Sequence, residues 1–377
     1  MTTSKKHKRA IVSVINDLVT DQRVHRTCMV LYELGYDVLL VGRKKKNSKV
    51  LPDRIYKTKR MHLFFEKGVC FYLEFQIRLS FFLLRNKANL LYANDLDTLF
   101  PNFLTSNLKK STLIYDSHEI FCEVPELLAT PFKKKIWLTL EKSIVPKLKY
   151  CITVNNSIAK WFMEKYTIQF NVVRNIGDFS TVDQLKSRAE LGIPENKKMI
   201  LIQGAGINID RGAEEVVEAM QYLTQIVLYI IGSGDVIGQL KQMCIEKQLQ
   251  DKVVFIDKIP ADALVHYTAC ADLGLTLDKD TNLNYRYSLP NKVFDFINAG
   301  IPILSSRLPE LEVLINKYQI GDFIDNHQPK HIATKINELL SSIDYSIWKR
   351  NTQLAKKENC WQIEKQHLIE VIKQSAG

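Results

Sequence analysis

Short apolar runs alternate with segments of helical period along the whole chain of 377 residues, and this alternation limits the folds that are open to it. In the first half, the runs that predict strands are 9–16, 37–42, 89–94, 111–116 and 150–155. The longer segments between them carry apolar residues at the spacing of one helix face. Strands that are apolar throughout and separated by helices are typical of a parallel sheet with helices on both faces. The first half therefore predicts a doubly wound α/β domain.

The same alternation starts again near residue 199, after a stretch over 175–198 that is rich in turn-forming residues and predicts a linker. The second set of predicted strands is 199–204, 227–234, 253–258, 272–277 and 301–306. The chain is long enough for two domains of ordinary size. We therefore predict two Rossmann-like domains in tandem, over 1–175 and 176–346.

The chain is basic, with a formal net charge of +11 and a pI of about 9.1. Such a surface attracts nucleotide phosphates, nucleic acid or acidic lipid, but nothing resembles a nucleic-acid-binding module, so we expect no nucleic-acid partner. The seven cysteines are scattered without a C-x-x-C pair, as expected of reduced, buried thiols in the cytosol. No apolar segment of signal length precedes the polar pair Asn16 and Asp17, so a secretory signal is not expected.

Two segments raise the question of a membrane. The most apolar window, 68–87, is interrupted by Glu74, Gln76 and Arg78, so it is not the run of about 20 apolar residues that a spanning helix needs. It predicts either a buried helix or a Phe-rich helix that touches a membrane surface. The basic run over 131–149 is either a solvated helix face or a surface that binds an anionic bilayer.

The stretch 203–212, QGAGINIDRG, follows the first predicted strand of the second domain. Ile209 replaces the third glycine of G-x-G-x-x-G, and no acidic residue ends the next strand, which argues against NAD binding. Gly204 and Gly206 would still let the backbone approach a phosphate. Arg211 could clamp a diphosphate; the alternative is a solvated arginine at a helix start.

A helix is predicted from Pro290 to Gly300, within SLPNKVFDFINAGIPIL. Lys292 lies in its first turn, where the helix dipole disfavours a cation, so a bound anion would supply the missing negative charge. Asp295, one turn later, could accept hydrogen bonds from two hydroxyl groups of a ribose or sugar. The alternative is an amphipathic helix with a solvated outer face. The predicted core face consists of Leu289, Val293, Phe296 and Ile297.

These features together match the parts of a sugar nucleotide, since one end of the helix suits phosphates and the next turn suits a diol. A tight glycine turn also follows the second predicted strand of this domain. The candidate donor-binding residues are Gly204, Gly206, Arg211, Gly232, Gly234, Ser288, Leu289, Pro290, Asn291, Lys292 and Asp295.

In the first domain, polar residues follow two predicted strands. Asp95 lies within YANDLDTL, where D-L-D is either a metal-binding D-x-D or a helix N-cap followed by a helical acid. The presence of a second α/β domain favours the N-cap. His118 could hydrogen-bond a sugar hydroxyl or phosphate, and Glu119 could orient it or an acceptor. Asp95, His118 and Glu119 are therefore the candidate acceptor-side residues.

In their order and spacing, these motifs resemble those of the retaining glycosyltransferases of family four, which have the GT-B fold. The resemblance extends from residue 9 to about residue 315. The stretches that carry it are DQRVHRTCMVLYELGYDV (21–38), NDLDTL (94–99), YDSHEIFCEVPEL (115–127), ITVNNSIAKWF (152–162), RNIGDF (174–179), RGAEEVVEAM (211–220) and SLPNKVFDFINAGIPIL (288–304).

The resemblance implies two Rossmann-like domains that face each other across a cleft, with a C-terminal helix over 347–377 that packs back on the first domain. It implies a nucleoside diphosphate sugar of the UDP or GDP type as donor, bound by the second domain. A glycan or lipid-linked acceptor would bind to the first. Hexosyl transfer would retain the anomeric configuration and need no metal and no cofactor. We expect a cytoplasmic protein, peripheral on the inner face of the membrane.

The resemblance also implies roles for single residues. Arg211 and Lys292 would contact the donor diphosphate, Asp295 would hold the nucleotide ribose, and His118 would lie near the donor sugar. His118, Arg211 and Lys292 are thus the predicted catalytic residues. Tyr287 stands where the family has a glutamate that contacts the donor sugar. The residues that could replace this glutamate are Asn284, Tyr285, Arg286 and Ser288.

Two other functions remain open on the sequence. A sugar-nucleotide epimerase of the same two-domain shape would need a denser set of acids and bases. A non-catalytic, glycosyltransferase-like partner subunit is suggested by the missing glutamate at Tyr287 and by the basic surface.

Overall fold

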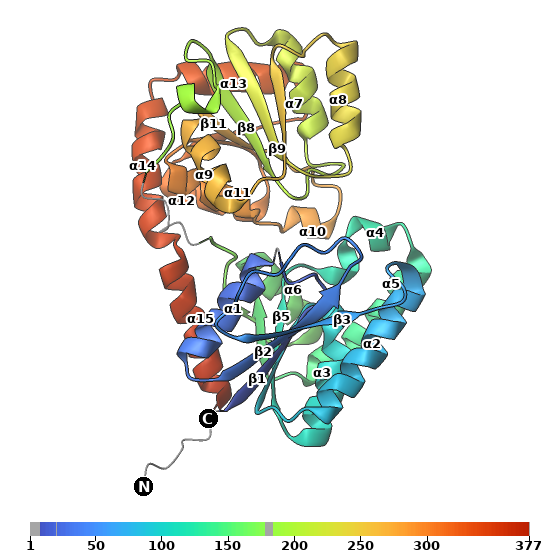
Figure 1. The fold of residues 1–377 in the computed structure, drawn as a ribbon. Helices are drawn as coiled ribbons and strands as arrows, with labels where there is room; N and C mark the ends of the chain where they lie inside the picture. The colour runs from blue at the N-terminus through green and yellow to red at the C-terminus, as the bar shows by residue number, and fades with distance from the viewer. Residues whose placement is uncertain (1–7, 20, 178–183, 377) are drawn as a thin grey trace. The chain divides into compact units, whose positions relative to one another are not determined.

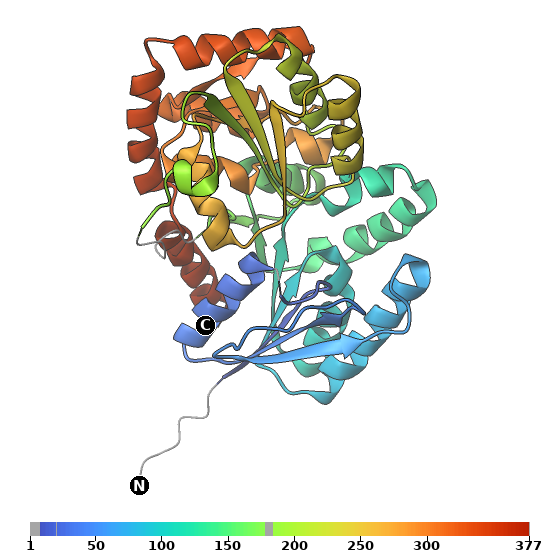
Figure 2. The same cartoon turned by 45° about the horizontal axis from the view of Figure 1, so that its top comes forward.

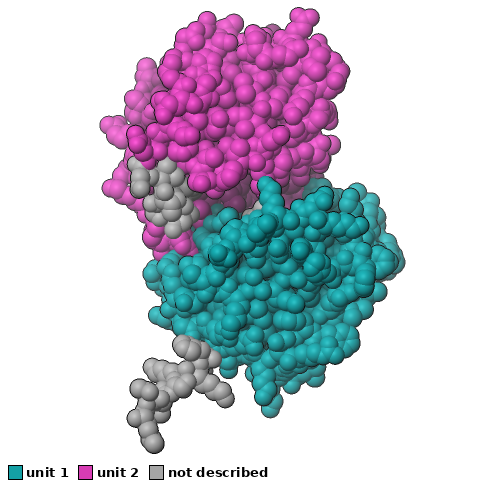
Figure 3. All heavy atoms as spheres, in the orientation of Figure 1, with its two compact units in different colours: residues 1–175, 364–377 teal, residues 176–363 magenta. Residues whose placement is uncertain are grey.

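The computed structural model describes residues 8–19, 21–177 and 184–376. The chain divides into two compact units, which are residues 1–175 with 364–377, and residues 176–363 (Figure 3). Residues 1–7 of the N-terminal stretch and 178–183 of the predicted linker lie outside the described residues. Both units are parallel α/β sheets with helices on both faces, so the predicted fold class is confirmed (Figure 1).

The sheet of the first unit has seven parallel strands in the order β3-β2-β1-β4-β5-β6-β7. Five of them are the predicted strands. The other two, β3 and β7, were not predicted because they are edge strands without a continuous apolar run, KTKRMH and NV. The strands are β1 (Arg9–Ser13), β2 (Asp37–Lys44), β3 (Lys57–His62), β4 (Leu90–Asn94), β5 (Thr112–Ser117), β6 (Tyr150–Thr153) and β7 (Asn171–Val172).

The helices of this unit cover both faces of its sheet (Figure 1). The first begins at the predicted N-cap, Asp21, whose carboxylate accepts a hydrogen bond from the Val24 amide at 3.1 Å. On one face, Phe75, Leu79 and Leu83 pack fully buried against strand residues. The helices are α1 (Gln22–Glu33), α2 (Gly68–Arg85), α3 (Leu96–Lys109), α4 (Pro125–Leu128), α5 (Pro131–Ile144), α6 (Asn156–Tyr166) and most of α15 (Trp361–Ala376).

The end of the chain is two helices and not the single helix expected over 347–377. Helix α14 (Tyr345–Glu358) belongs to the second unit, and the chain breaks at Asn359, whose side-chain amide donates to the Ala355 carbonyl at 2.7 Å. From Glu364 onward, α15 lies with the first unit, beside α1 in both views (Figures 1 and 2). The carboxylate of Glu364 is buried and pairs with Arg174 at 2.6 Å.

The sheet of the second unit has six parallel strands in the order β10-β9-β8-β11-β12-β13. Its strands are β8 (Lys198–Gly204), β9 (Ile226–Gly232), β10 (Val253–Asp257), β11 (Leu273–Thr276), β12 (Ile303–Ser306) and β13 (Gly321–Ile324). Its helices are α7 (Ala213–Ala219), α8 (Ile237–Glu246), α9 (Ala261–Cys270), α10 (Leu283–Arg286), α11 (Asn291–Ala299), α12 (Pro309–Tyr318), α13 (Pro329–Ser341) and α14.

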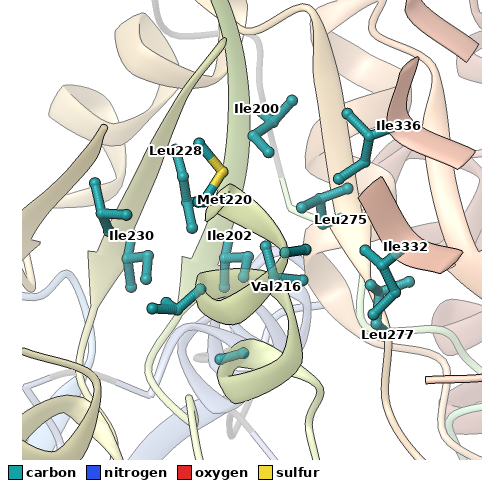
Figure 4. Packing of buried hydrophobic residues seen from close by; sticks show 14 of the residues in the cluster. Ile200, Ile202, Val216, Met220, Leu228, Ile230, Leu275, Leu277, Ile332 and Ile336 are labelled. Carbon is teal, nitrogen blue, oxygen red and sulfur yellow. The ribbon is translucent and has the colours of Figure 1, made fainter. Parts of the chain in front are cut away.

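Alternate strand residues of the second unit point to two separate cores. Ile200 and Leu228 point toward α7 and α13, where they meet Val216 and Ile336 (Figure 4). Their neighbours on the strands point the other way, toward α11 and α12. Burial of one such side chain contributes about 1.5–3 kcal/mol, so the two cores hold each strand and its following turn in place.

Among the described helices, none is both long and apolar enough to span a bilayer. The prediction that the cysteines are buried fails for Cys70, whose side chain is exposed on α2.

Candidate active site

The predicted helix at 290–300 is present as α11 and begins at the carboxyl edge of the second unit's sheet. Pro290 is its N-cap residue, and Gly300 ends it in the left-handed conformation with φ +77°. Val293, Phe296 and Ile297 are fully buried. This face anchors the helix to the sheet, which leaves Lys292 and Asp295 half-buried on its outer side.

The glycine turns after β8 and β9 serve two different purposes. A Cβ on Gly232 would lie 1.7 Å from the Gly204 carbonyl oxygen, and one on Gly234 would lie 1.9 Å from that of Ile207. These glycines let the two turns pack against each other, so packing alone accounts for them. A Cβ on Gly206 would meet nothing within 4 Å. Gly206 therefore borders open space that a ligand could enter.

Arg211 lies just before α7, and its side chain contacts Asp278 and Tyr285. Its Nη1 is 3.2 Å from Oδ2 of Asp278, and its guanidinium lies 4.5 Å from the centre of the Tyr285 ring. The Tyr285 hydroxyl in turn donates to the Ile209 carbonyl at 3.4 Å. A simple solvated arginine, which was the alternative prediction, does not describe this arrangement. The guanidinium is pre-positioned while part of it stays exposed.

Lys292 shares this electrostatic environment. Burial lowers the pKa of its ammonium group; the Asp278 carboxylate opposes this shift, and the Arg211 charge adds to it. The Asp278 side chain is fully buried. Arg211 and Lys292 thus both interact with the Asp278 carboxylate, so these three groups together carry one more positive than negative charge. Such an arrangement favours an incoming anion.

Asp295 belongs to a polar network that the sequence did not suggest. Its Oδ2 accepts a hydrogen bond from Gln203 Nε2 at 2.8 Å, and Gln203 Oε1 accepts one from the Thr268 hydroxyl at 2.7 Å. The network orients the carboxylate at the second turn of α11. Both Gln203 and Asp278 come at or just beyond strand ends, and that position was the signal that could have identified them.

The segment before α11 contains the residues that could replace the glutamate expected at Tyr287. Tyr287 caps the short helix α10. The Tyr285 ring packs against the Arg211 guanidinium, and Arg286 is exposed and pairs with Asp280 at 2.8 Å. The Ser288 hydroxyl is buried and, within the described part of the chain, has no hydrogen-bond partner. Ser288 therefore offers a polar group without a partner among the described residues, and the buried side-chain amide of Asn284 is a second candidate.

In the first unit, His118 lies between two carboxylates. Its Nδ1 is 3.0 Å from Asp95 Oδ2, and its Nε2 is 3.5 Å from Asp116 Oδ2. Burial alone would lower the pKa of the imidazole, but Asp95 and Asp116 outweigh this effect and raise it to about 10. His118 is therefore an imidazolium at neutral pH, which can donate hydrogen bonds but cannot accept a proton.

The structure refines the prediction for Asp95. Asp95 occupies the N-cap position of α3, but its carboxylate makes no capping bond; it accepts instead from the His118 backbone amide at 2.8 Å. Asp95 and Asp116 both contact the His118 ring. Asp116, the last residue of the predicted strand 111–116, was not among the candidate site residues.

Asp116 is itself fixed by a buried network. Arg23 makes a two-pronged contact with its carboxylate, at 2.8 and 3.2 Å, and the Tyr92 hydroxyl donates to it at 2.9 Å. Burial would raise the pKa of Asp116, but the nearby Arg23 and His118 charges lower it well below its usual range. The His118 ring is thus held by groups that remain charged.

The second unit carries the match to a known family. Residues 183–356 match the family model described as Glycosyl transferases group 1. Among curated proteins, the chain is 22% identical over 267 residues to a chitobiosyldiphosphodolichol beta-mannosyltransferase of Candida albicans. That alignment covers 63% of this chain and 57% of the relative. The chain spans about half the length of the curated relatives that it matches.

Solved structures match over nearly the whole chain. A sucrose-phosphate synthase from Thermosynechococcus elongatus has a TM-score of 0.80 at 14% identity, with 98% of this chain and 99% of that chain covered. Anabaena HepE in complex with UDP and glucose has a TM-score of 0.73 at 14% identity, with coverage of 97% and 100%. At these identities the likeness concerns the fold, which is that of the GT-B glycosyltransferases.

Proposed function

We propose that this chain transfers a hexose from a nucleoside diphosphate sugar to an acceptor hydroxyl, because residues 183–356 match the family model of the group 1 glycosyl transferases. The donor is of the UDP or GDP type, and the acceptor is a glycan or a lipid-linked carbohydrate. Transfer retains the anomeric configuration and needs no metal.

The observation that carries this proposal is the arrangement of Arg211, Asp278 and Lys292 at the start of α11. As the bond between sugar and diphosphate breaks, the leaving group gains negative charge. Two fixed cations beside it stabilise that charge more than they stabilise the bound donor, which is how such groups accelerate a reaction. Asp295, oriented by Gln203, accepts hydrogen bonds from the ribose hydroxyls.

The proposed reaction forms a bond between the acceptor oxygen and the anomeric carbon while the bond from that carbon to the diphosphate breaks. The acceptor approaches from the side of the leaving group, and its proton passes to a departing phosphate oxygen. His118 does not take this proton because its imidazole is already protonated. Its part is to donate a hydrogen bond to a sugar hydroxyl.

Replacement of Lys292 tests the diphosphate assignment. We expect Lys292→Ala to weaken binding of UDP or GDP at least tenfold, because one of two phosphate contacts is lost. Isothermal titration calorimetry measures this directly. Lys330→Ala is the matched control, since Lys330 is exposed and is likewise the second residue of its helix, α13. Equal affinities of the two variants would contradict the assignment.

A panel of sugar nucleotides separates the proposed activity from the two alternatives. Slow hydrolysis of one donor, followed by mass spectrometry, supports transfer. Conversion of the sugar to an epimer supports an epimerase, and absence of binding to any donor supports a non-catalytic partner subunit.

The surface of the first unit supports peripheral attachment to an anionic membrane. The prediction of a buried helix over 68–87 holds for one face of α2, where Phe75 and Leu79 are buried, while the opposite face is exposed. Helix α5 adjoins α2 through an edge contact between Tyr72 and Trp137 and exposes Phe132. We call this surface the apolar stripe; its members are Val69, Leu73, Ile77, Phe81, Phe132 and Ile136, with Lys67, Arg85, Lys133 and Lys135 exposed nearby.

A further inference from the structure

A second group of buried polar atoms lies in the first unit, next to the His118 site but made of other side chains. Arg43 is near the carboxyl end of β2, and its guanidinium lies 4.3 Å from the centre of the Phe71 ring. Its Nη1 donates to the Glu66 backbone carbonyl at 3.3 Å, and its Nε is buried without a partner. Among the described residues, no carboxylate forms an ion pair with Arg43. Arg43 is half-buried with its Nε shielded from water, so an anion would stabilise its unpaired charge.

Two further unsatisfied atoms belong to the same group. Asp97 is 5% exposed, and its Oδ1 is buried without a partner in the described part of the chain. Gln76 donates from Nε2 to the Asp97 backbone carbonyl, while its own Oε1 is buried and unsatisfied. Arg43 is close enough to Asp97 for each to affect the pKa of the other. Three buried polar atoms without a hydrogen-bond partner in the described part of the chain thus lie in one region: Arg43 Nε on β2, Gln76 Oε1 on α2 and Asp97 Oδ1 on α3.

The surroundings of Asp97 disfavour its charged form. Burial raises the pKa of the Asp97 carboxyl well above its usual value, and the neighbouring Asp95 and Glu119 charges raise it further. His118 and Arg43 oppose this shift without reversing it. The shift favours the protonated carboxyl, which can donate a hydrogen bond. A cation and a neutral donor side by side are suited to an oxyanion.

We propose that Arg43 and Asp97, with Gln76 supporting Asp97, bind an anionic group of the acceptor. This inference rests on the proposed function, because it assigns the acceptor a phosphate or a carboxylate. Both groups offer oxygen atoms to the guanidinium and to the protonated carboxyl. The exposed residues Lys44, Lys45 and Lys46 follow Arg43 directly and attract such an acceptor toward the site.

Ligand-observed NMR tests the proposal with simple probes. Glucose 6-phosphate, glucuronate and glucose are added in turn to the full chain, with UDP and GDP in excess to fill the donor site. We expect one of the two anionic sugars to bind at least tenfold more tightly than glucose, and this identifies the anion as phosphate or carboxylate. We expect Arg43→Gln to abolish the difference and Arg85→Gln, an exposed charge on α2, to preserve it.

Asp97→Asn is the second variant, because it replaces the protonated acid by a neutral group that still donates. We expect its affinity to stay within twofold of wild type; threefold tighter binding would mean that Asp97 is ionised and would contradict the proposal. Binding of both anionic sugars no tighter than that of glucose would overturn it, as would unchanged binding to a folded Arg43→Gln protein. Calorimetry with UDP and GDP on the same preparation separates these outcomes from failure of the proposed function, which would show as absent nucleotide binding.

Discussion

At the scale of single residues, charge neighbours decide what each functional group can do. His118 and His25 belong to the same unit, but their environments act in opposite directions. Burial, assisted by Arg54 and Arg26, lowers the pKa of His25 to about 4, whereas two carboxylates raise that of His118 to about 10. The residue type alone therefore does not tell which histidine is charged.

This difference predicts two separate titrations in a histidine-labelled NMR experiment. We expect His25 to titrate near pH 4 and His118 to remain an imidazolium until about pH 10. Because the pKa of His118 is raised on folding, its charged contacts stabilise the folded chain fully below about pH 6.5, and this contribution is lost as the pH rises through about 10. Asp95→Asn should move the His118 titration to lower pH. An unshifted titration in that variant would contradict the electrostatic account.

The residue scale also shows the balance around Asp278. Its buried carboxylate pairs with Arg211 and opposes the loss of charge on Lys292. In the proposed function, it thus limits the repulsion between these two cations before a donor binds, but it also reduces the net positive charge toward a diphosphate.

At the scale of elements, the two βα turns of the second unit must fit closely before a ligand can lie beside them. The turn after β9 packs on the turn after β8, with the Ser233 amide donating to the Gly204 carbonyl at 3.1 Å. Gly232 has φ +145°, a conformation that other residues rarely adopt. The geometry of one turn therefore depends on the glycine of the other.

Two glycine substitutions separate packing from binding at these turns. Gly232→Ala should destabilise the chain by more than about 2 kcal/mol, because its Cβ would overlap the Gly204 carbonyl oxygen. Gly206→Ala should leave the unfolding free energy within about 1 kcal/mol of wild type but weaken nucleotide binding, since its Cβ occupies open space. Urea denaturation and calorimetry give the two quantities. Equal destabilisation by both substitutions would refute this division of roles.

At the scale of the whole molecule, net charge and exposed apolar surface act together. In the proposed attachment, the charge of +11 would attract the chain to anionic lipid, and the apolar stripe on α2 and α5 would supply side chains that enter the headgroup region. Neither contribution alone gives stable attachment, because electrostatic attraction is screened by salt and a few apolar side chains bury little area.

Sedimentation with liposomes tests this attachment. We expect the chain to sediment with vesicles that contain anionic lipid at low salt, and much less at 0.5 M salt, where the Debye length falls to about 4 Å. Leu73→Ser combined with Phe81→Ser should reduce the bound fraction at least fivefold. Val313→Ser, on the exposed face of α12 in the other unit, should have no effect. Binding that is independent of salt and of the stripe would rule out this surface.

The sequence by itself determined the two parallel α/β units, most of their strands and the helix at 291–299, because strand alternation and helical period are properties of neighbouring residues. It also led to Arg211, Lys292, Asp295 and His118, since they follow strand ends or lie on a polar helix face. Edge strand β3 was missed because its residues are polar and it pairs through its backbone with β2. The order of apolar and polar residues within 57–62 does not show which strand its backbone pairs with.

Only the tertiary structure decided how these side chains are paired. Asp278 meets Arg211 from 67 positions away, and Arg23 meets Asp116 from 93 positions away. Whether His118 is charged, whether Asp97 is neutral and whether Arg43 has a partner all depend on groups that folding brings together from distant strands. Burial and charge pairing are set by three-dimensional distance, and sequence spacing does not measure that distance.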